Sequence, residues 1–187
     1  MLLLVGALTA IGAVSLADGV FIKAKAGVAQ VLLERAWNET LAGEAKARPW
    51  HWADVYPVAK IEMARLNESA IALSGVSGEA MAFGPGVMEG APAPGEPGLS
   101  IIAAHRDTHF QFLQHVAIGD EFTITKPDGE RLAFQIVETR IVDANRSGLR
   151  LEGARPRVAL VTCWPFDETQ RGSARFVAIA ELQAPLS

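Results

Sequence analysis

The sequence has 187 residues, of which 50% are hydrophobic and 20% are charged, and its formal net charge at pH 7 is −4. This composition excludes a disordered chain, and the acidic balance excludes nucleic acid as a main partner, since phosphate binding needs a basic surface. The single cysteine, Cys163, excludes an internal disulfide framework and a cysteine-rich zinc site. What remains is one domain with an additional N-terminal segment.

The first segment, residues 1–17, is apolar or small throughout, and the first charged residue is Asp18. Its length is at the lower limit for a membrane-spanning helix, which would continue through residues 19–22 if Asp18 lies at the interface. A signal peptide is the main alternative, because Ala24-Lys25-Ala26 has the form of a cleavage site, and a buried core helix is a third. We therefore expect residues 1–22 to be a transmembrane anchor or a signal segment. Either one places the rest of the chain outside the cytoplasm.

The next segment, residues 23–54, is expected to lead into the main domain. Apolar residues recur at spacings of three and four over residues 27–41, which predicts an amphipathic helix that ends at Gly43. This helix would be a stalk or a cover packed on the domain. Residues 48–54, which include two tryptophans, are expected to be extended.

Residues 55–187 have the pattern of an all-β domain with short helices, because apolar runs of strand length alternate with turn signals. Asp128-Gly129 indicates a hairpin turn, and the five glycines and four prolines of residues 84–98 predict a loop without a strand. Short helices are expected at residues 79–83 and 109–116. The expected strands cover residues 58–63, 70–73, 100–104, 121–126, 131–143, 158–162 and 175–182, which suggests a closed or nearly closed β-barrel.

Cys163 is the first candidate for chemistry. It follows an apolar run over residues 158–162 and precedes Trp164-Pro165, and a proline cannot continue a central strand. The thiol is therefore expected at a strand end, where catalytic groups are often displayed. The alternative is a small buried hydrophobic residue, which is common for a free cysteine. An unpaired thiol in an oxidising compartment favours a functional role.

A cysteine nucleophile acts as its thiolate and needs a neighbouring cation. Among the four histidines, His105 follows the apolar run of residues 100–104 and is expected at a strand end. We expect the rings of His51, His109 and His115 to be either solvated or hydrogen-bonded within the core.

A second cation is needed where negative charge develops on the attacked carbonyl oxygen. Arg175 opens the last expected strand, and a short polar loop joins that strand to the one that ends at Cys163. The two strands are therefore expected to pair and to bring Arg175 close to Cys163. Arg171, inside the loop, is the alternative.

Three motifs together resemble the sortases, which are membrane-anchored cysteine transpeptidases: A-L-V-T-C at residues 159–163, H-R-D-T at residues 105–108, and Arg175 at the start of a strand. The sortase nucleophile motif is usually T-L-x-T-C, and Ala159 stands at its first position here. Flanking segments are similar to the sortase branch of Gram-negative bacteria, namely L-L-E-R-A-W at residues 32–37, P-W-H-W-A-D at 49–54, A-F-G-P-G at 82–86 and P-G-E-P-G at 94–98.

The resemblance implies an eight-stranded sortase-type barrel and assigns roles to three residues. Cys163 would attack the carbonyl after Thr in an L-P-x-T-G-like C-terminal sorting signal, His105 would protonate the leaving amine, and Arg175 would bind the substrate backbone or the oxyanion. An amine acceptor would then resolve the thioacyl enzyme. The residues expected to contact substrate beside them are Thr162, Arg106 and Asp107.

The implied partners are a substrate protein with a C-terminal sorting signal, an amine acceptor, and the membrane through the N-terminal helix. The chain would be a single-pass protein of the inner membrane with its catalytic domain on the periplasmic side. No cofactor is expected, and no metal is expected because the sequence has no dense Asp/Glu cluster. Two alternatives are an extracytoplasmic cysteine endopeptidase, in which water resolves the thioester, and a non-catalytic periplasmic β-barrel binding module with a buried cysteine.

Overall fold

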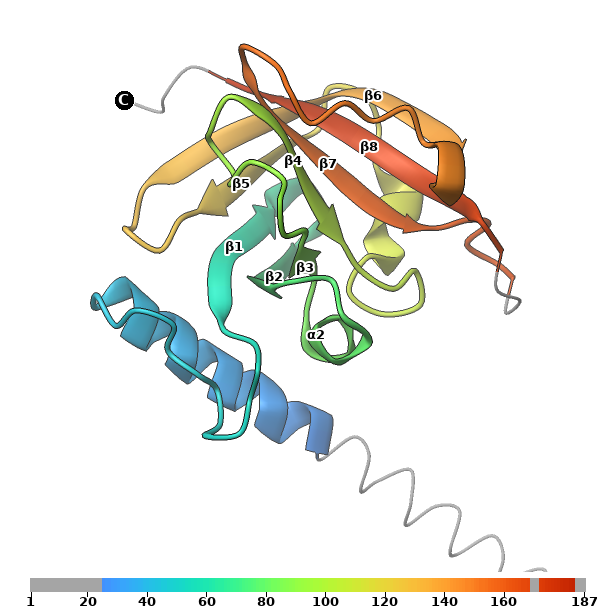
Figure 1. Cartoon of the computed structure of the whole chain (residues 1–187). Helices are drawn as coiled ribbons and strands as arrows, with labels where there is room; N and C mark the ends of the chain where they lie inside the picture. The colour runs from blue at the N-terminus through green and yellow to red at the C-terminus, as the bar shows by residue number, and fades with distance from the viewer. Residues whose placement is uncertain (1–24, 169–171, 184–187) are drawn as a thin grey trace, which may run out of the picture.

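The computed structural model describes residues 25–168 and 172–183, and these residues form a closed barrel of eight strands with a helix against one side (Figure 1). The strands are β1 (Pro57–Met63), β2 (Glu68–Ser74), β3 (Gly86–Val87), β4 (Gly98–Ala103), β5 (Glu121–Thr125), β6 (Arg131–Asp143), β7 (Pro156–Cys163) and β8 (Ala174–Leu182). Their order around the barrel is β1-β2-β3-β4-β7-β8-β6-β5. The pairs β2–β3 and β4–β7 are parallel, and the others are antiparallel.

All seven strands expected from the sequence form, and none of their ends is shifted by more than two residues. The expected hairpin is present between β5 and β6, where Gly129 has a φ of +84° and Lys126 N–H donates to Glu130 O at 2.8 Å. Helix α2 (Gly78–Phe83) matches the expected helix at residues 79–83, and the Ser77 hydroxyl caps it by accepting from Ala80 N–H at 3.1 Å.

The expectation of a helix over residues 109–116 was too long. Only a 3-10 helix, Gln111–His115, forms there, because Phe112 and Leu113 are its only buried residues and a short turn suffices to bury them. His109 consequently lies in the loop between β4 and this turn rather than in a helix.

The expectation that residues 84–98 contain no strand was wrong. β3 pairs with Leu73 and Ser74 of β2 on one side and with Ile102 and Ala103 of β4 on the other, and it thereby closes the barrel. The sequence obscures this strand because it is only two residues long and is surrounded by Gly and Pro. Glycine at position 86 is required by the close approach of another segment, since a Cβ there would collide with the backbone carbonyl of Gly75.

Strands β4, β7 and β8 have two buried faces, because successive side chains point to opposite sides of a strand. One set fills the barrel interior and includes Ile102, Leu160 and Ala178. The other set packs on the outside of the barrel and includes Ile101, Ala159 and Val177. Met88, Leu149 and Leu151 from neighbouring loops cover this outer set. The outer face is therefore a second, smaller core.

The helix over residues 25–41 is a cover packed on the barrel, which decides between the two roles expected for it. Leu33 and Trp37 are buried against Ile71 and Leu73 of β2. The helix ends as expected at Gly43, whose φ is +98° and whose N–H donates to Thr40 O at 3.0 Å. The apolar stripe is narrower than the sequence indicated, since Val28 and Val31 of the expected stripe are exposed.

In the part of the chain that the structure describes, no helix combines the length and the apolar character needed to cross a membrane. The expected anchor or signal segment, residues 1–22, and the alternative cation Arg171 lie outside the described residues.

Candidate active site

Cys163 and Arg175 are direct partners in the antiparallel β7–β8 ladder. Cys163 is the last residue of β7 and Arg175 the second residue of β8, so the ladder fixes the spacing of their backbones. Each is two residues from a member of the outer set, Val161 on β7 and Val177 on β8, so both side chains point to the outside of the barrel. The sequence-based expectation that these two strands pair, with Arg175 close to Cys163, is confirmed.

The guanidinium of Arg175 is oriented by the loop that precedes it. Nη1 donates to the carbonyls of Gly172 at 2.7 Å and Ala174 at 2.9 Å. Within the described residues, no hydrogen bond uses Nε or Nη2 of this side chain. Since a guanidinium carries five N–H donors in a planar fork, Arg175 retains donors for a carbonyl or an oxyanion beside the thiol.

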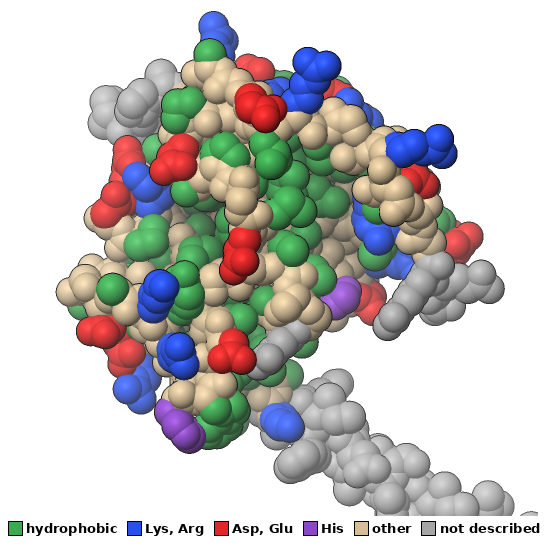
Figure 2. All heavy atoms as spheres, in the orientation of Figure 1, with side chains coloured by type: hydrophobic (Ala, Val, Ile, Leu, Met, Phe, Trp, Pro, Cys, Tyr) green, Lys and Arg blue, Asp and Glu red, His purple; other side chains and the backbone are tan. Residues whose placement is uncertain are grey.

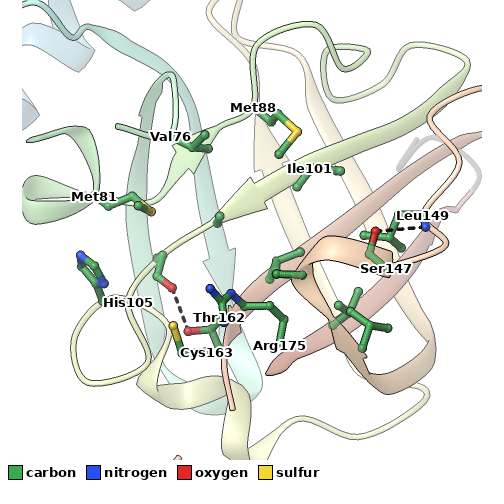
Figure 3. A pocket seen from close by; sticks show the side chains of 16 residues that line it. Val76, Met81, Met88, Ile101, His105, Ser147, Leu149, Thr162, Cys163 and Arg175 are labelled. Atoms are coloured by element: carbon green, nitrogen blue, oxygen red, sulfur yellow. Dashed lines mark hydrogen bonds between the residues drawn. The ribbon is translucent and has the colours of Figure 1, made fainter. Parts of the chain in front are cut away.

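His105 reaches the same edge of the barrel because β4 runs parallel to β7. The register pairs Ala103 with Val161, and Ala104 N–H donates to Val161 O at 3.1 Å. Extending this register by two residues places His105 level with Cys163. In Figure 3, Cys163 lies between His105 on one side and Arg175 on the other.

Thr162 fixes this arrangement from within the protein. Its side chain is buried, and the hydroxyl donates to Ala104 O at 2.8 Å. This bond joins the residue before Cys163 to the residue before His105 (Figure 3). The hydroxyl of Thr162 is therefore engaged in a bond that connects the two strand ends, and the residue also lines the groove described next. Its expected contact with substrate stays a prediction.

A groove of about 400 Å³ opens over these residues on the outer face of the barrel. Its walls are apolar and come from segments far apart in the sequence, chiefly Val76, Met81, Met88, Ile101, Val142 and Leu149. Among its described lining residues, the ionisable side chains are Cys163, His105 and Arg175. In the space-filling view, hydrophobic side chains gather over β4, β7 and β8, and charged side chains lie mostly around the rim (Figure 2). Such a groove suits a peptide with apolar side chains.

The accessibility of the thiol bears on its role. Cys163 is half-buried and lines the groove, and His105 is exposed. A cysteine that serves only as packing is normally enclosed in the core, whereas this thiol can be reached from solvent. The geometry can therefore support nucleophilic attack on a carbonyl that enters the groove.

Two further residues singled out from the sequence do not line the groove. Arg106 Nη1 donates to the Pro165 carbonyl, which links the loop after β4 to the loop after Cys163. Asp107 is exposed. The groove walls were not recognised from the sequence, because isolated apolar residues such as Met81 and Leu149 have the same pattern as core positions.

His109 lies in the loop after His105. Burial lowers the pKa of His109, and the charge of His105 lowers it further, while a hydrogen bond to the Ala82 carbonyl acts in the opposite direction. In the described part of the chain, no cluster of three or more metal-ligating side chains is present.

The family profile described as the sortase domain matches residues 61–183. The chain belongs to the sortase family. It is therefore a cysteine transpeptidase, and the barrel is of the sortase type, as the resemblance implied. No match was found among curated protein sequences.

Solved sortases share this fold. The Clostridium perfringens Sortase D5 transpeptidase aligns with a TM-score of 0.66 at 21% identity, covering 84% of this chain and 99% of that one. Sortase A from Corynebacterium diphtheriae aligns with a TM-score of 0.64 at 21% identity, covering 84% and 85%. Sortase C-1 from Actinomyces oris aligns with a TM-score of 0.62 at 24% identity, covering 70% and 76%.

Proposed function

We propose that this sortase cleaves an L-P-x-T-G-like C-terminal sorting signal through a thioacyl intermediate on Cys163 and transfers the acyl group to an amine. The observation that carries the proposal is the pairing of Cys163 with Arg175 across the β7–β8 ladder, with His105 at the end of the adjoining strand β4. These are a nucleophile, a cation and an acid–base group at one edge of one sheet.

The proposed reaction has two acyl transfers. The Cys163 thiolate attacks the carbonyl after Thr, a C–S bond forms, and the donors of Arg175 stabilise the oxyanion. His105 gives its proton to the leaving nitrogen as the C–N bond breaks. An incoming amine then attacks the thioester, passes its proton to His105, and releases the Cys163 thiolate. The apolar groove walls hold the residues before the scissile bond and exclude water from them.

The surrounding residues are assigned supporting roles. We propose that Thr162, which lines the groove, and Arg106, which follows His105, contact the substrate. Their hydrogen bonds to the carbonyls of Ala104 and Pro165 also support the end of β7 and the loop after β4. Asp107 is exposed two residues after His105, and its proposed role is contact with the part of the substrate outside the groove.

The proposal also covers the location of the protein in the cell and the division of the chain into an anchor, a connecting segment and a catalytic domain. The apolar composition of residues 1–22 supports an anchor in the inner membrane, with residues 23–54 leading to the catalytic barrel of residues 55–187 on the periplasmic side. The flanking segments, such as P-W-H-W-A-D at residues 49–54, support the sortase branch of Gram-negative bacteria.

The test uses the full-length enzyme in detergent with a peptide that carries an L-P-x-T-G-like signal. We expect mass spectrometry to detect an acyl adduct on Cys163, and an added primary amine to divert the product from acid to amide. Acid alone, even at saturating amine, would identify an endopeptidase. Neither adduct nor cleavage of any such signal would favour the non-catalytic binding module.

A further inference from the structure

A cleft of about 720 Å³ adjoins the catalytic groove. Val76 and Met88 line both spaces, so the cleft and the groove are continuous across these two side chains. Beyond them the lining changes from apolar to polar, and it includes the charged residues Lys46, Arg48, Asp54 and Glu89. We call this space the polar cleft. No step of the proposed reaction uses it.

Part of the polar cleft lies outside the residues that match the sortase profile. The match begins at residue 61, whereas Lys46, Arg48 and Asp54 belong to the segment between the helix over residues 25–41 and β1. This segment is held against the end of β2, because Tyr56 N–H donates to Ser74 Oγ at 3.2 Å and Ser74 N–H donates to Tyr56 O at 3.0 Å. The cleft is therefore a defined feature of this chain that the family profile does not describe.

The register of the sheet gives the separation between Cys163 and the mouth of the polar cleft. Met88 N–H donates to Ile101 O at 2.9 Å, and Ile101 pairs with Ala159 of β7. Ala159 precedes Cys163 by four residues on the same strand. At about 3.3 Å per residue, Met88 is therefore level with a point about 13 Å from Cys163 along the strand. In Figure 3, Val76 and Met88 accordingly lie well away from Cys163.

This separation matches the acyl part of the proposed substrate. Four residues precede the scissile bond in an L-P-x-T-G-like signal, and four extended residues span about 13 Å. The leaving amine departs on the side of His105, which protonates it, so the acyl part extends away from His105. An acyl segment that starts at Cys163 and runs along β7 toward Met88 therefore fills the groove. The substrate residue before the signal then enters the polar cleft.

Glu89 lies at this junction between the groove and the polar cleft. It directly follows Met88, and its Oε1 lies 3.6 Å from the position that a Cβ on Gly75 would occupy, beside Val76. Glu89 is exposed, and within the described residues its carboxylate has no hydrogen bond or ion pair. A substrate residue that leaves the groove between Val76 and Met88 therefore meets an unpaired negative charge.

We propose that the polar cleft binds the substrate residue directly before the sorting signal and that Glu89 selects a lysine or arginine there. This inference rests on the proposed function and concerns a part of the substrate outside the signal. A cationic side chain gains a charge-assisted hydrogen bond to the carboxylate, whereas an acidic side chain is repelled. The other charged residues of the cleft carry both signs, and Lys46 Nζ lies over the Tyr56 ring at 5.5 Å from its centre. They favour a polar residue over an apolar one without deciding its sign.

The test is a competition between two peptides in one reaction, because the ratio of their products does not depend on the amount of folded enzyme. The full-length enzyme in detergent receives equal amounts of two peptides with the same L-P-x-T-G-like signal, one with Lys and one with Glu directly before it. Mass spectrometry at low conversion gives the product ratio, which equals the ratio of the two kcat/KM values. The variants are Glu89→Gln and Glu89→Lys. Glu121→Gln, at an exposed position of β5 that does not line the cleft, is the matched control.

We expect the wild type and Glu121→Gln to prefer the Lys peptide by roughly fivefold, which is the size of a partly exposed ion pair. This preference should disappear in Glu89→Gln and reverse in Glu89→Lys. Equal use of the two peptides by the wild type, or an unchanged preference in both Glu89 variants, would overturn the proposal. Loss of the preference in the control would also overturn it, since the overall charge of the protein and not the cleft would then be responsible. Absence of cleavage of both peptides would instead refute the proposed function.

Discussion

Cys163 is held opposite Arg175 by the ladder between β7 and β8, at the point where both strands meet their connecting loop. The spacing of the two backbones is therefore set by strand geometry, whereas the guanidinium is aimed by the loop carbonyls of Gly172 and Ala174. A rigid ladder with a locally oriented cation is suited to a site in which charge appears during the reaction.

Cys163→Ala is expected to abolish acyl-enzyme formation and transfer, because the nucleophile is lost. The free energy of unfolding should change by no more than about 1 kcal/mol, since the thiol is small and half-buried. Mass spectrometry of the enzyme after incubation with peptide and a urea denaturation curve check the two parts. Residual transfer in this variant would remove Cys163 from the mechanism.

Arg175→Lys is expected to reduce kcat/KM by roughly a hundredfold, because an ammonium cannot reproduce the planar fork and the loss is that of one oxyanion donor. Peptide turnover is the measurement, and Arg140→Lys on β6 is the control, since Arg140 does not line the groove. Wild-type turnover in Arg175→Lys would transfer the role to Arg171.

Thr162→Val is expected to destabilise the protein by about 1–3 kcal/mol, because the buried Ala104 carbonyl loses its hydrogen bond from the hydroxyl. Turnover should fall as well, since the bond connects the ends of the strands that carry Cys163 and His105. Thr162→Ser keeps the hydroxyl, and in urea denaturation and peptide turnover it should stay closer to the wild type than Thr162→Val does. A loss of stability and turnover in Thr162→Ser that equals the loss in Thr162→Val would contradict this role of the hydrogen bond.

Acid is expected to weaken the fold partly through Asp120, whose side chain is 9% exposed and bonds to Arg65. Burial alone raises the pKa of Asp120, but hydrogen bonds from Arg65 and Ala117 N–H outweigh it, so the pKa lies below its ordinary value. The unfolded chain then binds this proton more readily, so the stabilisation is present above about pH 4 and is lost as the pH falls below it. Comparison of urea denaturation at pH 7 and pH 3 should show a smaller loss in Asp120→Asn than in the wild type.

Removal of residues 1–22 is expected to release the protein from membranes while peptide transfer is retained, because the candidate catalytic residues all lie after residue 100. Fractionation and the peptide assay measure the two properties. Loss of folding in the truncated protein would assign this segment to the core. A mature N-terminus near Gly27 in the full-length preparation would show cleavage as a signal peptide.

The strands were predictable because period-2 alternation and turn residues are local signals. The β7–β8 pairing followed from the short loop between those strands. By contrast, β4 and β7 are separated by more than fifty residues, and nothing local indicates that they lie side by side in parallel. The sequence placed His105 and Cys163 each at a strand end, but only this long-range pairing brings the two ends to the same edge.

The groove and β3 were not predictable for related reasons. Whether an apolar residue such as Met88 packs in the interior or lines a surface groove depends on what covers it, which is a tertiary property. In β3, neighbouring strands impose an extended conformation on a segment whose own composition favours a turn. Hydrogen bonding from both sides outweighs local preference there.

Strand β7 serves two surfaces with alternate residues: Val158 and Leu160 fill the barrel interior, while Ala159 and Val161 form the outer set that ends at Cys163. A deletion or insertion of a single residue within β7 would exchange these two sets. The thiol would then point into the barrel, and the interior would lose its apolar filling at the same time. In this strand, the register of the ladder matters more than the identity of any one apolar residue. Insertions and deletions within β7 are therefore far less tolerable than conservative substitutions.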